Sequence, residues 1–327
     1  MREESPKVSV ITITYNQEDC IAEAIESVLG QTYKNIELIV ADDGSTDNNP
    51  AIINEYAGKH SIIKPILAKE NKGIAYNINR ALKLVEGQYV AWVDGDDVMF
   101  PQKIEKQVRY LNTNLDVVAC GHDMEVFRSP TGESLGRHSK VISTKKPKGK
   151  IDVKSLFDPT FFLCPPSALM VRREYIPAHG FDTRLKYGAD LLFYIEVLRN
   201  GKFGYIDEVL GKYRRHSKSL TGSDAAEKIG FEERLIILSI VMARYPELYK
   251  LIKKRRTAFY VYEAVESVKR GDKKRAKTIS KVLISEGSFI RGLLAHALSQ
   301  ILSQGLVNKA YNSKYRKRLT DILRKVA

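Results

Sequence analysis

"GQYVAWVDGDDVMFPQK", residues 87–103, is an apolar strand-like segment that runs into three aspartates within four positions. The carboxylates of Asp94, Asp96 and Asp97 repel one another, so holding them together costs free energy. Two interpretations are open at this point. The aspartates hold a cation, or they form an acidic turn that begins the helix predicted at residues 100–111, because Asp is favoured at helix starts.

Strands and helices alternate along the chain up to this stretch. The pattern predicts strands at residues 7–16, 35–45, 62–71 and 88–93, and helices at residues 18–31, 49–60 and 73–87. The third helix is expected to present one apolar face, made of Ile74, Ile78, Ala81, Leu82 and Val85. This order of elements is typical of an α/β fold with a doubly wound sheet.

Polar residues stand at the ends of three of these four strands. They are Thr14, Tyr15 and Asn16 after the first strand, Asp42 and Asp43 after the second, and the three aspartates after the fourth. Ligands of open α/β sheets bind beyond the carboxyl ends of the strands, so the sequence predicts a site at this edge. Ionised aspartates offer only oxygen ligands, which suit a hard divalent ion such as Mg²⁺ or Mn²⁺ that also binds a diphosphate.

Other nucleotide-binding signatures are missing from the sequence. Neither a G-x-G-x-x-G pattern after the first strand nor a G-x-x-x-x-G-K-[ST] pattern occurs. This absence argues against a dehydrogenase and against a kinase-like protein.

Bulk properties indicate a globular protein with a strongly basic end. The chain has 327 residues, 43% of them apolar, and a net charge of +14. From Ala225 onward 23 Lys and Arg stand against 9 Asp and Glu, whereas the preceding residues hold 30 of each. We therefore predict a catalytic domain at residues 1–222 and a basic helical domain at residues 223–327.

The sequence also bears on cellular location. "MREESPK" lacks the pattern of a signal peptide, and no apolar run reaches the ~18 residues of a membrane span. Cys20, Cys120 and Cys164 are odd in number and widely spaced, which favours reduced thiols in a cytosolic protein. Residues 128–150 are polar and without periodicity, which predicts a long loop that is either a lid or disordered.

Ordered motifs over residues 6–222 resemble the family 2 glycosyltransferases. They are "VSVITITYNQEDCIAEAIESVLGQTYKNIELIVADDGSTD", "ENKGIAYNINRALKLVEGQYVAWVDGDD", "GFDTRLKYGADLLFYIEVL" and "YRRHSKSLT". The resemblance implies a GT-A fold, a nucleotide-sugar donor that is UDP-linked by family habit, a divalent metal, and inversion at the anomeric carbon. Because the Q-x-x-R-W pattern and trailing membrane helices are absent, addition of a single sugar is expected.

The resemblance also implies roles for single residues. Asp190 matches the general base, Asp96 and His216 match metal-binding positions, and Asp43 matches the residue that bonds the nucleotide base. Asp94 matches the acid near the ribose and diphosphate. The remaining residues expected to bind the donor are Thr14, Asn16, Asn79 and Arg215, and Arg214 could add donors to the phosphates.

Several positions depart from the family pattern. The Glu that normally precedes the catalytic acid is Ala189, and the next two acceptor-contacting positions are Leu191 and Leu192. Ile13 replaces a frequent Pro, and Ile78 replaces a frequent Arg. Candidates for stacking on an acceptor sugar are Phe161, Phe162 and Tyr187.

The basic C-terminal region leaves three interpretations open. It contains the clusters "KKRR" (253–256), "KRGDKKRAK" (269–277) and "KYRKR" (314–318), and an apolar face between residues 290 and 302. It could lie on an anionic membrane at the inner face of the cell envelope, where a lipid-linked or cell-surface glycan acceptor is found. It could instead form a packed homo-oligomer contact. Nucleic-acid binding by this tail is the alternative from another class, but it leaves the acidic rim unexplained.

Overall fold

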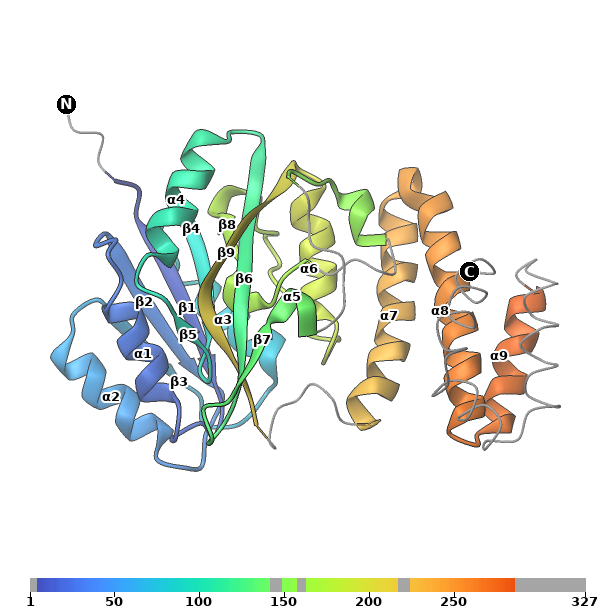
Figure 1. Ribbon diagram of the computed structural model, residues 1–327, viewed down its shortest axis with the longest axis horizontal. Coiled ribbons are helices and arrows are strands. Elements are labelled where there is room, and N and C mark those ends of the chain that lie inside the picture. Colours follow the sequence, from blue (N-terminus) through green and yellow to red (C-terminus); the bar gives the residue numbers. More distant parts are fainter. Residues whose placement is uncertain (1–4, 142–148, 158–162, 217–223, 286–327) are drawn as a thin grey trace. The chain divides into compact units, whose positions relative to one another are not determined.

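A computed structural model of the chain describes residues 5–141, 149–157, 163–216 and 224–285 (Figure 1). The residues fall into two compact units, the first up to Gly230 and the second from Phe231, with residues 157–159 grouped with the second. The domain boundary expected at residue 222 adjoins residues outside the described ranges.

The first unit follows the predicted alternation and then extends it. Its first half contains β1 (Val8–Thr14), α1 (Ile21–Leu29), β2 (Ile36–Asp42), α2 (Asn49–Lys59), β3 (Ile63–Leu67), α3 (Ile74–Leu82), β4 (Tyr89–Asp94), β5 (Val98–Met99) and α4 (Lys103–Thr113). Its second half contains β6 (Val117–Arg128), β7 (Ser134–Arg137), α5 (His138–Val141), the 3₁₀ turns Val153–Phe157, Pro166–Ala168 and Arg173–Tyr175, β8 (Met170–Arg172), α6 (Ala189–Leu198) and β9 (Lys202–Arg215).

One curled mixed sheet joins all of these strands. Its order is β3-β2-β1-β4-β8-β6-β9-β5, and β7 pairs with β6. The strands β3, β2, β1 and β4 are parallel, so their carboxyl ends meet at one edge. β8 runs antiparallel to β4 and β6, and β9 runs parallel to β6. β9 also pairs antiparallel with β5, with Val98 opposite Lys212, and this pairing brings residues near 214 back to the first half of the chain.

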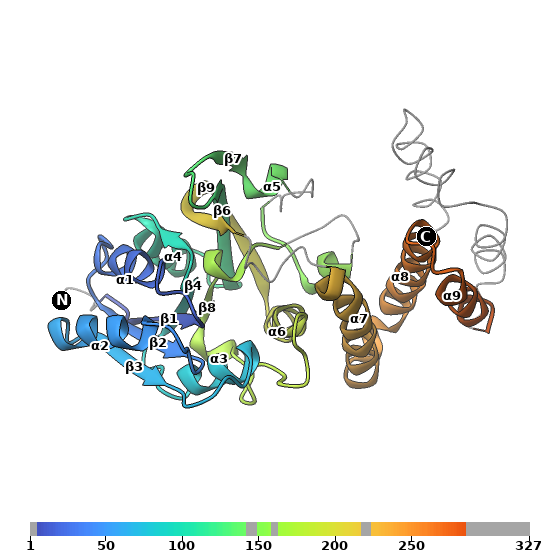
Figure 2. The same ribbon diagram turned by 90° about the horizontal axis from the view of Figure 1, so that it is seen from below.

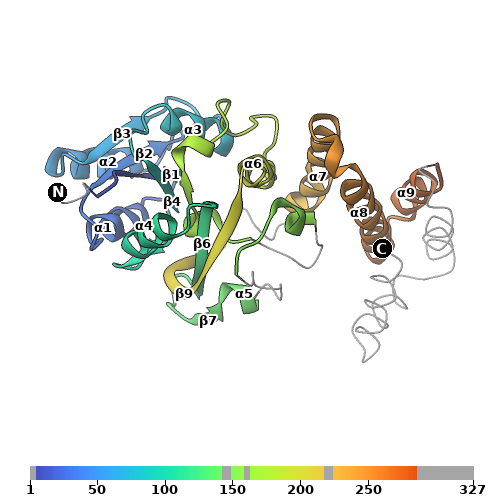
Figure 3. The same ribbon diagram turned by 90° about the horizontal axis from the view of Figure 1, so that it is seen from above.

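Helices cover both faces of the sheet. α1 buries Ile21, Ala24, Ile25 and Val28, which share one face at helical spacing, and Gly30 follows the helix. Residues of α1, α2 and α4 belong to one apolar core with alternate residues of β1, β2 and β4. Figures 2 and 3 show α1 and α4 on one side of the sheet, and α3 and α6 on the other.

Two local predictions need correction. α3 ends at Leu82, so Val85 lies beyond it, and Ile74 is exposed. The buried face is instead Ala75, Asn77, Ile78 and Ala81. The predicted loop at residues 128–150 contains β7 and α5, because β6 continues and offers β7 a hairpin partner. Residues 142–148 of that stretch lie outside the described ranges.

The second unit is helical, as its sequence pattern predicts. It contains most of α7 (Asp224–Arg244), the turn Pro246–Leu248, α8 (Tyr249–Lys269) and α9 (Lys273–Ser285). α8 and α9 pack through Val261, Ala264, Ile279 and Leu283. Within the part of the chain that the structure describes, none of the helices is both long and apolar enough to cross a membrane. The apolar face predicted at residues 290–302 and the cluster at residues 314–318 lie outside that part.

Candidate active site

The aspartate turn follows β4 at the edge where the parallel strands end. Gly95 donates its N–H to the Ile13 carbonyl at 2.9 Å, and a Cβ on Gly95 would lie 2.8 Å from Thr14 Cβ. The turn therefore packs tightly against the end of β1. It does not cap α4, because β5 intervenes and the N-cap residue Gln102 makes no side-chain cap bond.

The carboxylates of this turn are compensated only in part, because the charge of buried Lys103 lowers the pKa of Asp94 less than burial and neighbouring acids raise it. Burial, followed by the charge of Asp96, raises the pKa of Asp94 to about 7. The same two causes raise the pKa of Asp97 well above its usual range. Asp97 accepts a bond from the Arg214 N–H at 2.9 Å, but its buried Oδ2 has no hydrogen-bond partner in the described structure. Acidic groups are thus concentrated here in an environment that disfavours their charged form, at a cost in stability.

His216 and Arg214 reach this turn from the end of β9. His216 Nε2 lies 2.9 Å from Asp96 Oδ2, so the two predicted metal ligands stand side by side. Arg214 is buried, donates from Nε to the Asp96 carbonyl at 2.7 Å, and pairs with Glu23. Arg214 therefore holds the turn in place, a role that the sequence reasoning missed. No pattern in the sequence distinguishes Arg214 from Arg215; in the structure Arg214 is buried in phase with Leu210 along the strand.

Arg215 makes different contacts from Arg214. Its guanidinium lies 5.9 Å from the ring centre of Tyr213, and its Nε is buried without a hydrogen-bond partner in the described structure. A donor group that has no partner is available to a phosphate oxygen, so its predicted contact with the donor stays a prediction.

Asp190 lies in the first turn of α6. The N-cap of this helix is Gly188, so Asp190 does not cap it, and Asp190 Oδ1 accepts a bond from the Leu191 N–H at 2.8 Å. The charge of Asp190 contributes to the raised pKa of Asp94, which places the predicted base within electrostatic reach of the aspartate turn.

The loop after β2 is held by a dense set of hydrogen bonds. Asp42 is fully buried and accepts bonds from the N–H groups of Gly44 and Ser45 at 3.0 and 2.9 Å. Asn49 donates to both Asp42 Oδ2, at 2.8 Å, and Thr14 Oγ1, at 3.0 Å. Thr14 therefore helps to hold the loop through Asn49, and its contact with a donor remains a prediction.

Asn16 and Tyr15 complete the end of β1. Asn16 has a positive φ of 51° and accepts the Thr46 N–H at 2.8 Å through its side chain, so it also shapes the loop. Tyr15 beside it is 44% exposed and offers a flat aromatic face at this edge. The sequence placed Tyr15 on the rim but gave it no role.

Asp43 connects this loop to α3. Its two carboxylate oxygens accept the N–H groups of Lys72 at 3.1 Å and Gly73 at 2.8 Å. Gly73 has a φ of +93° and directly precedes the helix. Asp43 thus lies at the positive end of α3 with a fixed orientation, while its predicted contact with a nucleotide base stays a prediction.

The other predicted residues are less central. Asn79 bonds the backbone of Phe181 with both of its amide atoms. Tyr187 is partly exposed beside Lys186, whose Nζ lies 5.5 Å from the ring centre. Phe161 and Phe162 lie outside the described ranges. Among the described residues no group of three or more His, Cys, Asp or Glu could hold a metal ion, so Asp96 and His216 would need ligands from the substrate and water.

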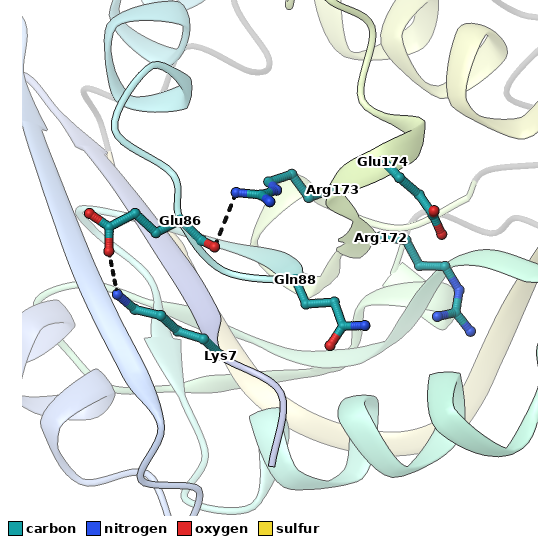
Figure 4. A pocket seen from close by; sticks show the side chains of 6 residues that line it. All are labelled: Lys7, Glu86, Gln88, Arg172, Arg173 and Glu174. Carbon is teal, nitrogen blue, oxygen red and sulfur yellow. Dashed lines mark hydrogen bonds and ion pairs between the residues drawn. The ribbon is translucent and has the colours of Figure 1, made fainter. Parts of the chain in front are cut away.

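A separate hollow of about 350 Å³ lies at the opposite edge of the sheet, where β1 and β4 begin (Figure 4). It is lined by Lys7, Glu86, Gln88, Arg172, Arg173 and Glu174. Glu86 pairs with Lys7 at 2.6 Å and its carbonyl accepts a bond from Arg173 at 3.1 Å. None of the predicted donor-binding residues lines this hollow.

Comparison with known proteins agrees with this geometry. The sequence profile described as "Glycosyl transferase family 2" matches residues 9–177. EpsE of Bacillus subtilis (strain 168), a relative named as a glycosyltransferase, is 37% identical over 216 residues, which are 65% of this chain and 74% of EpsE. The chain belongs to glycosyl transferase family 2, and it is a glycosyltransferase.

Solved structures show the same fold at low sequence identity. S. aureus TarS 1-349 in complex with UDP superposes with a TM-score of 0.66 and 17% identity, covering 93% of this chain and 91% of that one. Mannosyltransferase PcManGT from Pyrobaculum calidifontis, in complex with GDP-Man and Mn2+, gives a TM-score of 0.62 and 16% identity, covering 99% and 86%. The predicted GT-A fold is confirmed.

Proposed function

We propose that this chain is a metal-dependent, inverting transferase that moves a single sugar from a UDP-linked donor to a hydroxyl group of a lipid-linked or cell-surface glycan. The observation that carries the proposal is the meeting of Asp94, Asp96 and His216 at one sheet edge, with Asp190 in electrostatic reach. Support for the donor class comes from TarS, which is solved with UDP and with UDP-GlcNAc, and from PcManGT, which is solved with GDP-Man.

The residues of the aspartate turn fit a divalent ion. Asp97 Oδ2 is buried without a partner, and Asp96 and His216 present an oxygen and an imidazole nitrogen to the same place. These two residues would hold Mn²⁺ or Mg²⁺, which when bound supplies positive charge to the departing diphosphate. PcManGT, solved with Mn2+, supports this choice of ion.

The chain's own residues perform the proton transfer and the positioning. The acceptor oxygen forms a bond to the anomeric carbon, and its proton passes to a carboxylate oxygen of Asp190. The bond between that carbon and the diphosphate breaks, and the diphosphate leaves with the electron pair. Attack on the face opposite the leaving group inverts the configuration. Asp43, fixed by two backbone N–H groups, orients the nucleotide.

Thermal unfolding with UDP or GDP, each with and without Mn²⁺, tests this proposal. A ligand at about 100 times its Kd stabilises by about 2.7 kcal/mol, which is a shift of a few degrees. We expect a metal-dependent shift with UDP in the wild type. Asp96→Asn should abolish it, whereas Asp116→Asn, which removes an acid paired with Lys150 and Lys202, should keep it. No shift with either nucleotide, or a full shift in Asp96→Asn, contradicts the proposal.

The basic second unit is proposed to lie on an anionic membrane surface, at the cytoplasmic face where a lipid-linked acceptor is found. At the start of α8, Lys250, Lys253 and Lys254 are exposed beside the exposed apolar groups of Tyr249 and Leu251. Basic and aromatic side chains together suit such a surface, where each basic residue contributes about 1 kcal/mol.

Flotation with vesicles of neutral or anionic lipid tests this surface. Replacing Lys250, Lys253 and Lys254 by Gln should release the protein from anionic vesicles. A control with the same loss of charge replaces the exposed lysines Lys59, Lys69 and Lys83, and should still float. Equal loss in both variants, or association with itself or with DNA in place of lipid, contradicts the membrane proposal.

A further inference from the structure

Asn79 joins two segments that lie far apart in the sequence. It stands near the end of α3, and its Nδ2 donates to the Phe181 carbonyl at 2.8 Å. Its Oδ1 accepts the N–H of the same residue, also at 2.8 Å. The side-chain amide therefore pairs with the backbone of Phe181 on both sides, as a neighbouring strand would.

Gly180 makes this pairing feasible. It has a φ of +68°, and a Cβ at this position would lie 2.2 Å from Asn79 Oδ1. That distance is far shorter than any van der Waals contact, so a side chain here would push the amide away. The motif "HGFD" (179–182) thus contains a glycine that the bond from Asn79 requires.

Phe181, whose backbone Asn79 bonds, contacts α6 through its side chain. Its ring stacks on the ring of Phe193, with centroids 4.2 Å apart and planes 11° apart. Phe193 is 1% exposed and stands three residues after Asp190, so the two side chains share one side of the helix. The ring of Phe193 also meets Trp92 edge-on at 5.8 Å, and Trp92 shares a face of β4 with Asp94.

From these contacts we infer that Asn79 is a positioning residue, which sets the place of Asp190 opposite Asp94 through Phe181 and Phe193, and is not a ligand of the nucleotide. The inference rests on the proposed role of Asp190 as the base. A displacement of a catalytic group by ~1 Å can cost about 100-fold in rate, so a clamp of this kind affects turnover without touching the substrate.

Hydrogen exchange measures the clamp without any substrate. In Asn79→Ala we expect the Phe181 amide to exchange roughly tenfold faster, and the amides of Leu191 to Leu198 to lose protection with it. Gly180→Ala should do the same. Gly132→Ala is the matched control, because Gly132 has a φ of +72° with no atom within 4 Å of an added Cβ. Unchanged protection of α6 in Asn79→Ala overturns the inference.

Binding and turnover then separate a clamp from a donor ligand. The probes are UDP with Mn²⁺ for the Kd, and release of the nucleoside diphosphate from UDP-GlcNAc and GDP-Man for the rate. In Asn79→Ala we expect a Kd within about threefold of the wild type and a kcat lower by about 10- to 100-fold. A rise in Kd with unchanged kcat overturns the inference.

Asn79→Asp separates a clamp from a donor ligand by the Kd for UDP. It keeps the oxygen that accepts the Phe181 N–H but turns a second acceptor oxygen on the Phe181 carbonyl, so for a clamp it loses turnover as Asn79→Ala does while the Kd for UDP stays near that of the wild type. For a ligand its added charge would repel the diphosphate, so it would bind UDP more weakly than Asn79→Ala. This variant also distinguishes a positioning residue from a donor ligand if Asn79→Ala does not fold. A wild type that binds no nucleotide refutes the proposed function itself, whereas wild-type binding with a Kd effect at Asn79 refutes only this inference.

Discussion

The two ends of the same parallel strands treat buried carboxylates in opposite ways. Where the strands begin, Glu37 is 3% exposed and lies 2.8 Å from Lys64 Nζ and 3.0 Å from Lys7 Nζ. It also accepts bonds from Ser9 and from the Glu86 N–H. Burial alone would raise the pKa of Glu37, but these donors outweigh it and lower the pKa to about 2.

Where the strands end, the balance is reversed. Asp94 and Asp97 have raised pKa values because burial and their neighbours' charges prevail over the available donors. A sheet that can satisfy a buried acid at one end leaves acids unsatisfied at the other. The difference indicates that the amino end contributes stability, whereas the carboxyl end gathers unsatisfied acids, as the proposed cation site requires.

The largest effect is expected from Asp190→Asn at the carboxyl end. Loss of the proposed general base should lower turnover by about 10²–10⁴-fold, while UDP binding and thermal stability stay near those of the wild type. Release of the nucleoside diphosphate from UDP-GlcNAc or GDP-Man measures the rate. If this variant kept wild-type turnover, Asp190 would not be the general base.

Glu37→Gln, at the amino end of the strands, is expected to have the opposite effect, lowering stability and leaving turnover unchanged. Losing the charged hydrogen bonds should lower the free energy of unfolding by about 1.5–3 kcal/mol, with turnover unchanged below the unfolding temperature. Because the pKa of Glu37 is lowered on folding, its contribution is complete above the ordinary value of 4.5 and fades as the pH falls towards about 2. Urea unfolding of both proteins between pH 7 and pH 3 follows this loss. If the difference in free energy of unfolding between the two proteins did not depend on pH, the ionised Glu37 carboxylate would not be the source of the stability.

Asp97→Asn should sharpen the contrast by raising stability. The amide keeps an oxygen for the Arg214 N–H and removes an acid whose charged form is disfavoured by burial beside Asp94 and Asp96. We expect the free energy of unfolding of the ligand-free protein to increase by about 0.5–2 kcal/mol, as is common when a functional site is neutralised. Urea unfolding without metal measures it. A loss of stability would mean that the carboxylates are already compensated.

The smallest effect is expected at the surface. Glu55 and Lys59 form an exposed i,i+4 pair on α2, away from both carboxylate clusters. Glu55→Gln should change the free energy of unfolding least of all these variants, and the small effect should disappear in high salt. The same unfolding measurement, at low and high salt, sets the baseline against which the Glu37 effect is judged.

The sequence predicted those parts of the fold that local patterns determine. The strands at residues 7–16 and 35–45 correspond to β1 and β2, and the aspartates do follow β4. Hydrophobic periodicity is a local property, so alternating and helical spacing identified these elements without knowledge of the rest. The motif resemblance added the distant pair Asp96 and His216, which the structure brings together.

What the sequence could not predict depends on contacts between distant residues. Arg214 looked equivalent to Arg215, and only the pairing of β9 with β6 decides which guanidinium turns towards the aspartates. The bonds between Asn79 and Phe181 could not be predicted either, because a backbone partner carries no side-chain signal, and the predicted contact of Asn79 with the donor stays a prediction. Backbone groups are the same in every residue, so a clamp on the main chain leaves no mark in the pattern of residue types.

The return of β9 to the first half of the sheet has a consequence for synthesis of the chain. Asp96 leaves the ribosome 120 residues before His216 and 118 before Arg214, its partners at this edge. Domains generally fold as units, so the edge that carries the aspartates can be completed only after these two partners have been synthesised. A nascent chain that stops before β9 therefore lacks both residues that hold its acidic turn.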